Sequence, residues 1–340
     1  MTSAYSVELF DDPAAVLDVA GDLLAAQPVV WSVVASVTRQ AARSFTPGGP
    51  RPEHPMWWAV VRERGVAVAV SMRTMPHAPH TVWVPDLPEE AARLLARAAL
   101  DRTARAGDAP LTSANGPVAA VRAFTDEVLR TTGGTVREDR PERLWEATRI
   151  VRPDPPPSGH ARLATLADLD VVTAWFDVFH TEADAQAGRA PDEDAEPLRI
   201  GGARERIEDG DVWLWDVDGE VVQLTGARPP SFGVVRIGPV YTPREHRGRG
   251  YARALVADVA QRVLDDGDRV CLYTDRGNPV SNRVYAAIGF EPVLDQVNLA
   301  VDQVVRPGQA VASAPGATPD TTPETAPERT PPSVPATKES

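Results

Sequence analysis

The chain has 340 residues, of which 43% are hydrophobic, and its formal net charge is -13. This length and composition suit a globular protein of about two ordinary domains, and the negative charge argues against nucleic acid as a partner because phosphate backbones are bound by clustered positive charge. The sequence has no apolar run of about 18 residues and no secretory pattern near its start, so we expect no membrane association and a cytoplasmic location.

The sequence offers little for metal or disulfide chemistry. Cys271 is the one cysteine, which excludes an intrachain disulfide and a cysteine zinc site, and its place in a predicted strand indicates an inert buried thiol. The six histidines include one H-x-x-H pair, His77 and His80, but no nearby carboxylate or cysteine completes a set of metal ligands. We therefore expect no metal cofactor.

The first part of the chain predicts alternating strands and helices. Residues 7–16 (VELFDDPAAV) predict a strand followed by the start of a helix. The apolar patterns that follow predict a hairpin over Trp57–Val61 and Val66–Arg73, a strand over Thr81–Val84 and a helix over Glu89–Arg105.

Proline-rich segments divide the chain. Prolines 153, 155, 156 and 157, followed by Ser158 and Gly159, predict an extended connector over residues 152–159. It separates a first domain, residues 1–151, from a second, residues 160–305. From residue 306 the chain carries eight prolines and no aromatic residue, so the tail over 306–340 cannot bury a core and we expect it to be disordered.

In the second domain, a glycine-rich and basic turn stands between a predicted strand and a predicted helix. The β-branched run Val234–Tyr241 predicts the strand. The helix begins at Tyr251, stops near Gly267, and has apolar positions at Leu255, Val256, Val259, Val263 and Leu264. A further strand is predicted over Arg269–Thr274.

The turn itself has the features of a phosphate-binding site. Gly248 and Gly250 can adopt positive φ, so that successive N–H groups point into one concavity at the positive end of the helix. Fixed positive charge is added by Arg244, Arg247, Arg249 and Arg253. Taken alone, such a glycine-arginine turn is better interpreted as a solvated basic loop.

Residues Arg247–Ala252 resemble the acyl-CoA loop of the GNAT superfamily of N-acetyltransferases, Q/R-x-x-G-x-G/A, with Arg247, Gly250 and Ala252 at the fixed positions. The segment NPVSNRVYAAIGF, residues 278–290, is similar to the next motif of that family, an Asn-bearing helix start, a Tyr and a Gly-aromatic pair. The resemblance implies an α/β fold with a central mixed, mostly antiparallel sheet flanked by helices.

The two domains follow a matched order of elements, which predicts two GNAT-like domains. Residues 111–124 resemble residues 271–285 when Pro117 is set against Pro279, although chance similarity of two α/β segments is an alternative. The first copy has Pro85–Glu90, with three carboxylates and no glycine, in place of the basic turn, and Ala120 and Ala123 in place of Asn282 and Tyr285. Carboxylates repel a pyrophosphate, so we interpret the first domain as a degenerate copy that shields the second sheet and walls one side of the acceptor site.

The resemblance also implies roles for individual residues. The pantetheine would lie along the strand end at Val240, Tyr241 and Thr242, and the pyrophosphate on the amides of Gly248, Arg249, Gly250, Tyr251, Ala252 and Arg253. Asn278 and Asn282 would lie near the pantetheine, and Tyr285 would give a proton to the departing CoA thiolate. The local alternatives are a turn former for Asn278, an exposed helix residue for Asn282 and a packed aromatic for Tyr285.

The general base is less defined. Glu182 follows the first helix of the second domain, in a region that borders the acceptor site in this family. It is the first of six carboxylates, the others being Asp184, Asp192, Glu193, Asp194 and Glu196. These could attract a cationic amine or simply be solvated surface, and His180 and an activated water are alternative bases.

We therefore expect an enzyme that transfers an acetyl group from acetyl-CoA, its co-substrate, to a primary amine by direct attack in a ternary complex. The acceptor is a small molecule or a peptide, and the protein is a monomer or a homodimer. The alternative is a non-catalytic CoA-sensing or protein-interaction module. Retention of Arg247, Gly250, Asn282 and Tyr285 in one copy beside their loss in the other favours the enzyme.

Overall fold

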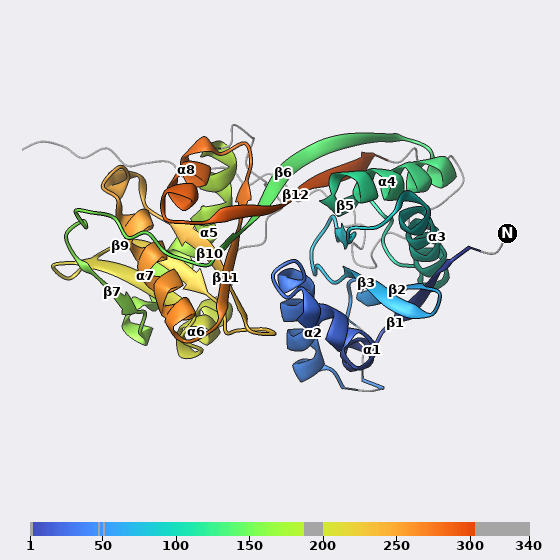
Figure 1. Ribbon diagram of the computed structural model, residues 1–340, viewed down its shortest axis with the longest axis horizontal. Coiled ribbons are helices and arrows are strands. Elements are labelled where there is room, and N and C mark those ends of the chain that lie inside the picture. The colour runs from blue at the N-terminus through green and yellow to red at the C-terminus, as the bar shows by residue number, and fades with distance from the viewer. Residues whose placement is uncertain (1–2, 47, 50–51, 187–199, 303–340) are drawn as a thin grey trace, which may run out of the picture. The chain divides into compact units, whose positions relative to one another are not determined.

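A computed structural model describes residues 3–46, 48–49, 52–186 and 200–302 (Figure 1). The tail over 306–340, predicted to be disordered, lies outside the described residues. So do Asp192, Glu193, Asp194 and Glu196 of the acidic loop, and the side chains of His180 and Asp184.

Strands and helices follow the same order in each half of the chain. The first half contains β1 (Tyr5–Phe10), α1 (Pro13–Ala26), α2 (Ser32–Ser44), β2 (Trp57–Glu63), β3 (Val66–Arg73), β4 (Val82–Trp83), α3 (Glu89–Ala106), β5 (Ser113–Pro117), α4 (Val118–Thr132) and β6 (Thr135–Ala147). The second half contains β7 (His160–Leu163), α5 (Leu169–Gln186), α6 (Ile200–Glu208), β8 (Val212–Val217), β9 (Glu220–Ala227), β10 (Val234–Tyr241), α7 (Tyr251–Asp265), β11 (Arg269–Asp275), α8 (Pro279–Ala287) and β12 (Glu291–Asp302). The described part of the second half also contains the 3-10 turns η1 (Leu166–Asp168) and η2 (Arg244–His246).

Within the described residues, the strands form one 12-stranded sheet in the order β1-β2-β3-β4-β5-β12-β6-β11-β10-β9-β8-β7. Neighbouring strands are antiparallel except for two parallel pairs, β4 with β5 and β10 with β11. These parallel pairs occupy equivalent places in the two halves. The mixed, mostly antiparallel sheet flanked by helices that the sequence predicted is confirmed.

The two halves exchange their last strands. β12 of the second half pairs with β5 of the first, for example at Asn298 and Asn115, while β6 of the first half pairs with β11 of the second, for example at Glu146 and Cys271. The exchanged strands also pair with each other along most of their length (Figure 1, green and red). The division of the chain at residues 152–159 remains a prediction, but each half of the sheet contains a strand from the other half.

The helices of the second half cover both faces of its sheet. Alternate residues of a strand point to opposite faces, and β10 accordingly sends Val235 and Ile237 into a core cluster with Leu255 of α7. The helices α5 and α6 cover β8 and β9 on the opposite face through a separate cluster that includes Leu214 and Leu224. The face of β10 that carries Arg236 therefore lies away from α7.

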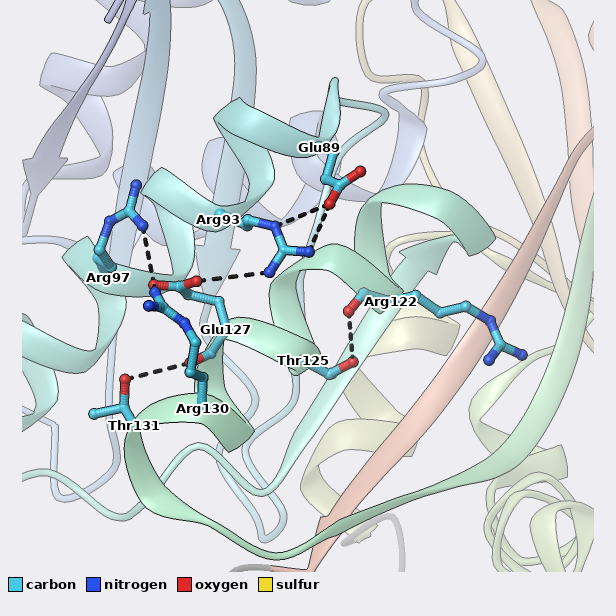
Figure 2. Close-up of polar contacts among 8 residues, drawn as sticks. All are labelled: Glu89, Arg93, Arg97, Arg122, Thr125, Glu127, Arg130 and Thr131. Carbon is cyan, nitrogen blue, oxygen red and sulfur yellow. Dashed lines mark hydrogen bonds and ion pairs between the residues drawn. The ribbon is translucent and has the colours of Figure 1, made fainter.

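A buried ion-pair cluster joins α3 and α4 in the first half (Figure 2). The side chain of Glu127 on α4 is 1% exposed. Its carboxylate forms ion pairs with Nη1 of Arg97 at 3.0 Å and Nη1 of Arg93 at 3.8 Å, both on α3. Arg130, one turn further along α4, is also bonded to this carboxylate. A buried carboxylate needs such partners, because an unpaired charge in the interior costs several kcal/mol, on the order of the whole stability of a small domain.

Several local predictions are confirmed. The hairpin of β2 and β3, the strand β10 and the helix α7 begin or end within two residues of the predicted bounds. Cys271 is fully buried, and burial raises the pKa of its thiol to about 11, as expected for an inert cysteine. No helix in the described part of the chain is long and apolar enough to cross a membrane.

Candidate active site

The pairing between strands β10 and β11 ends at Ile237. Their parallel ladder runs from Val234 opposite Arg269 to Ile237 opposite Leu272, and β11 then continues to Asp275 without β10 beside it. After a register shift, β10 goes on along its other neighbour, β9, with Val240 opposite Thr225. The backbone edge of β10 that faces β11 is therefore open from residue 238 onward, and an extended ligand can pair with it as an added strand.

The basic turn begins where β10 ends. Gly248 has φ of +77° and Gly250, the N-cap of α7, has φ of +84°. A Cβ added at either glycine would meet nothing within 4 Å, so glycine is required by backbone conformation and not by space. The first amides of α7, at Tyr251, Ala252 and Arg253, have no acceptor within the helix and lie at its positive end. This arrangement suits an anion such as a pyrophosphate.

Glu182 lies within α5 and not after it as predicted, and its carboxylate is bound to the basic turn. Arg244 Nε donates to its carboxylate at 3.2 Å, and Arg247 bonds to its other oxygen. Arg247 also donates through Nε to the carbonyl of Thr242 at 2.9 Å, which ties the turn to the end of β10. Burial, together with the neighbouring Glu182, raises the pKa of Tyr241 on β10. The contacts of Glu182 are those of a residue that positions the turn; its role as a base remains a prediction.

The two asparagines predicted to lie near the pantetheine shape the turn between β11 and α8. Asn278 is 7% exposed and caps α8, accepting from the amides of Val280 at 3.1 Å and Ser281 at 3.2 Å. Asn282 is half-buried, accepts from Thr274 Oγ1 at 2.6 Å and donates to the carbonyl of Asp275 at 3.2 Å. These bonds match the local alternative given above for Asn278.

Tyr285, the predicted proton donor, is 8% exposed and belongs to the core cluster beneath α7. Its ring meets that of Phe290 edge-on, with 6.1 Å between the ring centroids. Burial raises the pKa of its hydroxyl above the usual value of 10.0. The phenol thus keeps its proton at neutral pH, which a donor requires, and it also packs as a core aromatic.

The face of the sheet opposite α7 carries polar residues that the sequence analysis missed. Arg236 of β10 lies beside Cys271 of β11, and its Nη1 donates to Ser36 Oγ on α2 of the first half at 3.3 Å. Tyr273 of β11 meets the ring of Trp83 on β4 edge-on, with centroids 6.4 Å apart. The available signal was the arginine within the apolar run VVRIGPVY. Ser36 and Trp83 of the first half therefore contact this face, and whether it is the acceptor side remains a prediction.

Solved structures of known fold resemble this chain. The chain is similar to a GCN5-related N-acetyltransferase from Sphaerobacter thermophilus (16% identity, TM-score 0.55, 88% of this chain and 96% of that chain covered). It is also similar to an acetyltransferase from the GNAT family from Colwellia psychrerythraea (11%, 0.50, 87% and 99%) and to a tandem GNAT protein from the clavulanic acid biosynthesis pathway (16%, 0.51, 88% and 98%). The chain has the GNAT fold.

The sequence comparison with family models covers only part of the chain. Residues 221–299, from β9 to β12, match the family model described as FR47-like protein, and this range includes the whole basic turn and Tyr285. No curated protein matches the sequence. The resemblance to the GNAT superfamily that the motifs indicated is confirmed.

Proposed function

We propose that the protein transfers an acetyl group from acetyl-CoA to a primary amine by direct attack in a ternary complex. The observation that carries this proposal is the opening between β10 and β11 immediately before a positive helix end. The pantetheine pairs with the open edge of β10 at Val240–Thr242, and the pyrophosphate is bound by the amides of residues 248–253. Arg249 and Arg253 add positive charge there.

The described part of the first half lacks such an opening. Its parallel pair continues past β4, since Val84 N donates to the carbonyl of Asn115 at 2.8 Å, and Gly116 lies against the Val84 carbonyl. The helix α3 then begins after Pro88 with two carboxylates in its first turn, Glu89 and Glu90. A pantetheine finds no unpaired edge here and a pyrophosphate meets negative charge. The contrast supports one acyl-CoA site in the chain, in the second half.

The chemical step needs few groups. A neutral amine nitrogen attacks the thioester carbonyl carbon, the carbon–sulfur bond breaks, and the CoA thiolate takes the proton of the Tyr285 hydroxyl. The nitrogen loses its own proton to a base, for which the candidates are Glu182 and a water. Much of the rate comes from holding amine and thioester together. The site residues need no metal for these steps.

The test has two stages. Calorimetry on the full chain measures acetyl-CoA binding, and release of free CoA thiol is then followed with a panel of amines. We expect binding of acetyl-CoA and turnover with at least one class of amine. Absence of binding contradicts the proposal, and binding without turnover by any amine favours the non-catalytic CoA-sensing module.

A further inference from the structure

We propose that Arg236 binds a carboxylate on the acceptor, so that the acceptor is an amine that also carries a carboxylate, such as an amino acid. The site lies between β10 and β11 of the second half and α2 of the first. The inference rests on the proposed function, because it names the class of acceptor for that reaction.

The first argument is the unpaired charge of Arg236. Burial lowers the pKa of its guanidinium, yet among the described residues its one hydrogen bond goes to Ser36 Oγ at 3.3 Å and no carboxylate pairs with it. A buried charge without a partner is costly. The side chain is still partly accessible to solvent, so an anionic ligand can reach it.

Two other buried arginines, Arg73 and Arg206, show how this fold pairs a buried guanidinium. Arg73 donates to three carbonyl oxygens, those of His80, Ala109 and Pro110, at 2.7 to 2.9 Å. Arg206 of α6 pairs with Asp211 at 3.0 Å. Arg236, whose one hydrogen bond among the described residues is the 3.3 Å bond to Ser36, has no comparable set of partners, which points to a partner that arrives with a ligand.

The second argument is the polarity of the surroundings. Arg228 is near enough for its charge to lower the pKa of Arg236 further, and it contacts the neutral Gln40 at 3.5 Å. The hydroxyls of Ser32 and Tyr273 are buried there, close enough for Ser32 to interact with the Tyr273 hydroxyl and the Cys271 thiol. Positive charge beside hydroxyl groups that can turn toward a ligand is the donor set that a carboxylate needs.

Carboxylates facing this region do not neutralise it. Glu142 of β6 lies on the Tyr273 side and accepts from Asn115 Nδ2 at 3.0 Å. Asp211 is bound to Arg206 through both of its oxygens. Neither forms an ion pair with Arg236 in the described structure.

The third argument is position. Arg236 directly precedes Ile237, where the β10–β11 ladder ends, and the open edge of β10 begins two residues further on, about 7 Å along the strand. A carboxylate bound to the guanidinium thus leaves the amine of the same small molecule within reach of the opening. The guanidinium fork also matches a planar carboxylate through two parallel hydrogen bonds.

The experiment uses the full chain with saturating acetyl-CoA and matched acceptors: a panel of amino acids, the carboxamide of each, and a phosphorylated amine. CoA thiol release gives kcat/KM for each acceptor. We expect the carboxylates to exceed their carboxamides by at least about 10-fold, the value of one charge-assisted interaction. In Arg236→Met this preference is lost, chiefly through KM, while turnover of carboxamides persists.

Two further readouts separate ligand binding from a structural role. Arg236→Met should keep the melting temperature of the wild type or raise it, because it removes an unpaired buried charge, and calorimetry should find acetyl-CoA binding unchanged. Arg262→Met, on the exposed face of α7, is the matched control and should leave acceptor preference unaltered.

The outcomes distinguish the two proposals. Turnover of amines without regard to a carboxylate, preference for the phosphorylated amine, or equal losses on all acceptors in Arg236→Met would overturn the inference and leave the acetyltransferase intact. Binding of acetyl-CoA with no turnover of any amine would remove both.

Discussion

Gly116 of β5 and the carbonyl of Val84 are in such close contact that a Cβ at position 116 would come within 3.0 Å of that oxygen, a separation that real Cβ atoms do not show. The contact closes the parallel pair of the first half at the place where the pair of the second half is open. The contact also requires glycine at position 116, and this requirement can be tested by substitution.

We predict that Gly116→Ala destabilises the protein by about 1–3 kcal/mol, the usual effect of inserting a methyl group into a packed interior. Urea unfolding measures the change. Gly21→Ala is the control, because a Cβ at Gly21 in the helix α1 meets nothing within 4 Å and alanine is the better helix former. Equal destabilisation by the two substitutions would contradict the role of the close contact.

Gly250 and Gly267 give a matched pair at the two ends of α7, with φ of +84° and +85° and open space at both. Alanine at either position costs about 1 kcal/mol of backbone strain. We predict that Gly250→Ala weakens acetyl-CoA binding about 10-fold or more, whereas Gly267→Ala leaves the affinity unchanged. Calorimetry measures the acetyl-CoA affinity of each variant. Equal affinities in the two variants would argue against phosphate binding at the turn.

Of the two roles open to Glu182, base and positioning residue, its bonds to Arg244 and Arg247 favour positioning of the turn. Glu182→Gln should therefore raise the dissociation constant of acetyl-CoA several-fold and leave the pH profile of kcat in place, since no proton carrier has been removed. Calorimetry with acetyl-CoA and the pH dependence of kcat together distinguish a positioning residue from a general base. Unchanged affinity with a large loss of kcat and an altered acid limb would instead assign Glu182 as the general base.

The cluster around Glu127 predicts a strong effect on stability. Glu127→Gln removes the partner of Arg97 and Arg130 from a buried site, and we expect a loss of about 2 kcal/mol. Glu89→Gln breaks a pair with Arg93 in which the carboxylate is exposed, and should cost far less stability because solvent screens such a pair. A larger loss in Glu89→Gln than in Glu127→Gln would contradict this account.

The same cluster sets a pH dependence. Burial alone would raise the pKa of Glu127, but its bonds to Arg130 and Arg97 outweigh burial and lower it below 4.5. A carboxyl whose pKa is lower in the folded protein contributes stability that is complete above the unfolded value and is lost as the pH falls through the folded value. The stability advantage of wild type over Glu127→Gln should therefore persist at pH 6 and shrink below about pH 4; an advantage that grows on acidification would refute it.

The local parts of this fold could be predicted from the sequence. The β-branched run of β10 and the apolar spacing of α7 are local patterns that can be recognised in the sequence. The turn needs positive φ at Gly248 and Gly250, which glycine adopts more readily than other residues. The GNAT fold was implied by the resemblance of residues 247–252 and 278–290 to two motifs of that family, and the comparisons confirm the fold.

What could not be predicted depends on residues far apart in sequence. Nothing local in residues 135–147 specifies that β6 should pair with β11, more than 120 residues later. The position of Ser36 beside Arg236, 200 residues away, is likewise set by packing between the halves. The binding partners of Glu182 were missed because ion pairs follow from geometry that a charge pattern alone does not contain.

The reciprocal exchange of β6 and β12 has a consequence for how this protein unfolds. Removing one half would take away a neighbour of β5 or of β11 and leave unpaired amide and carbonyl groups along a long sheet edge, a template for self-association. The structure therefore predicts a single cooperative melting transition for the whole sheet, and a fragment cut at the proline connector should aggregate.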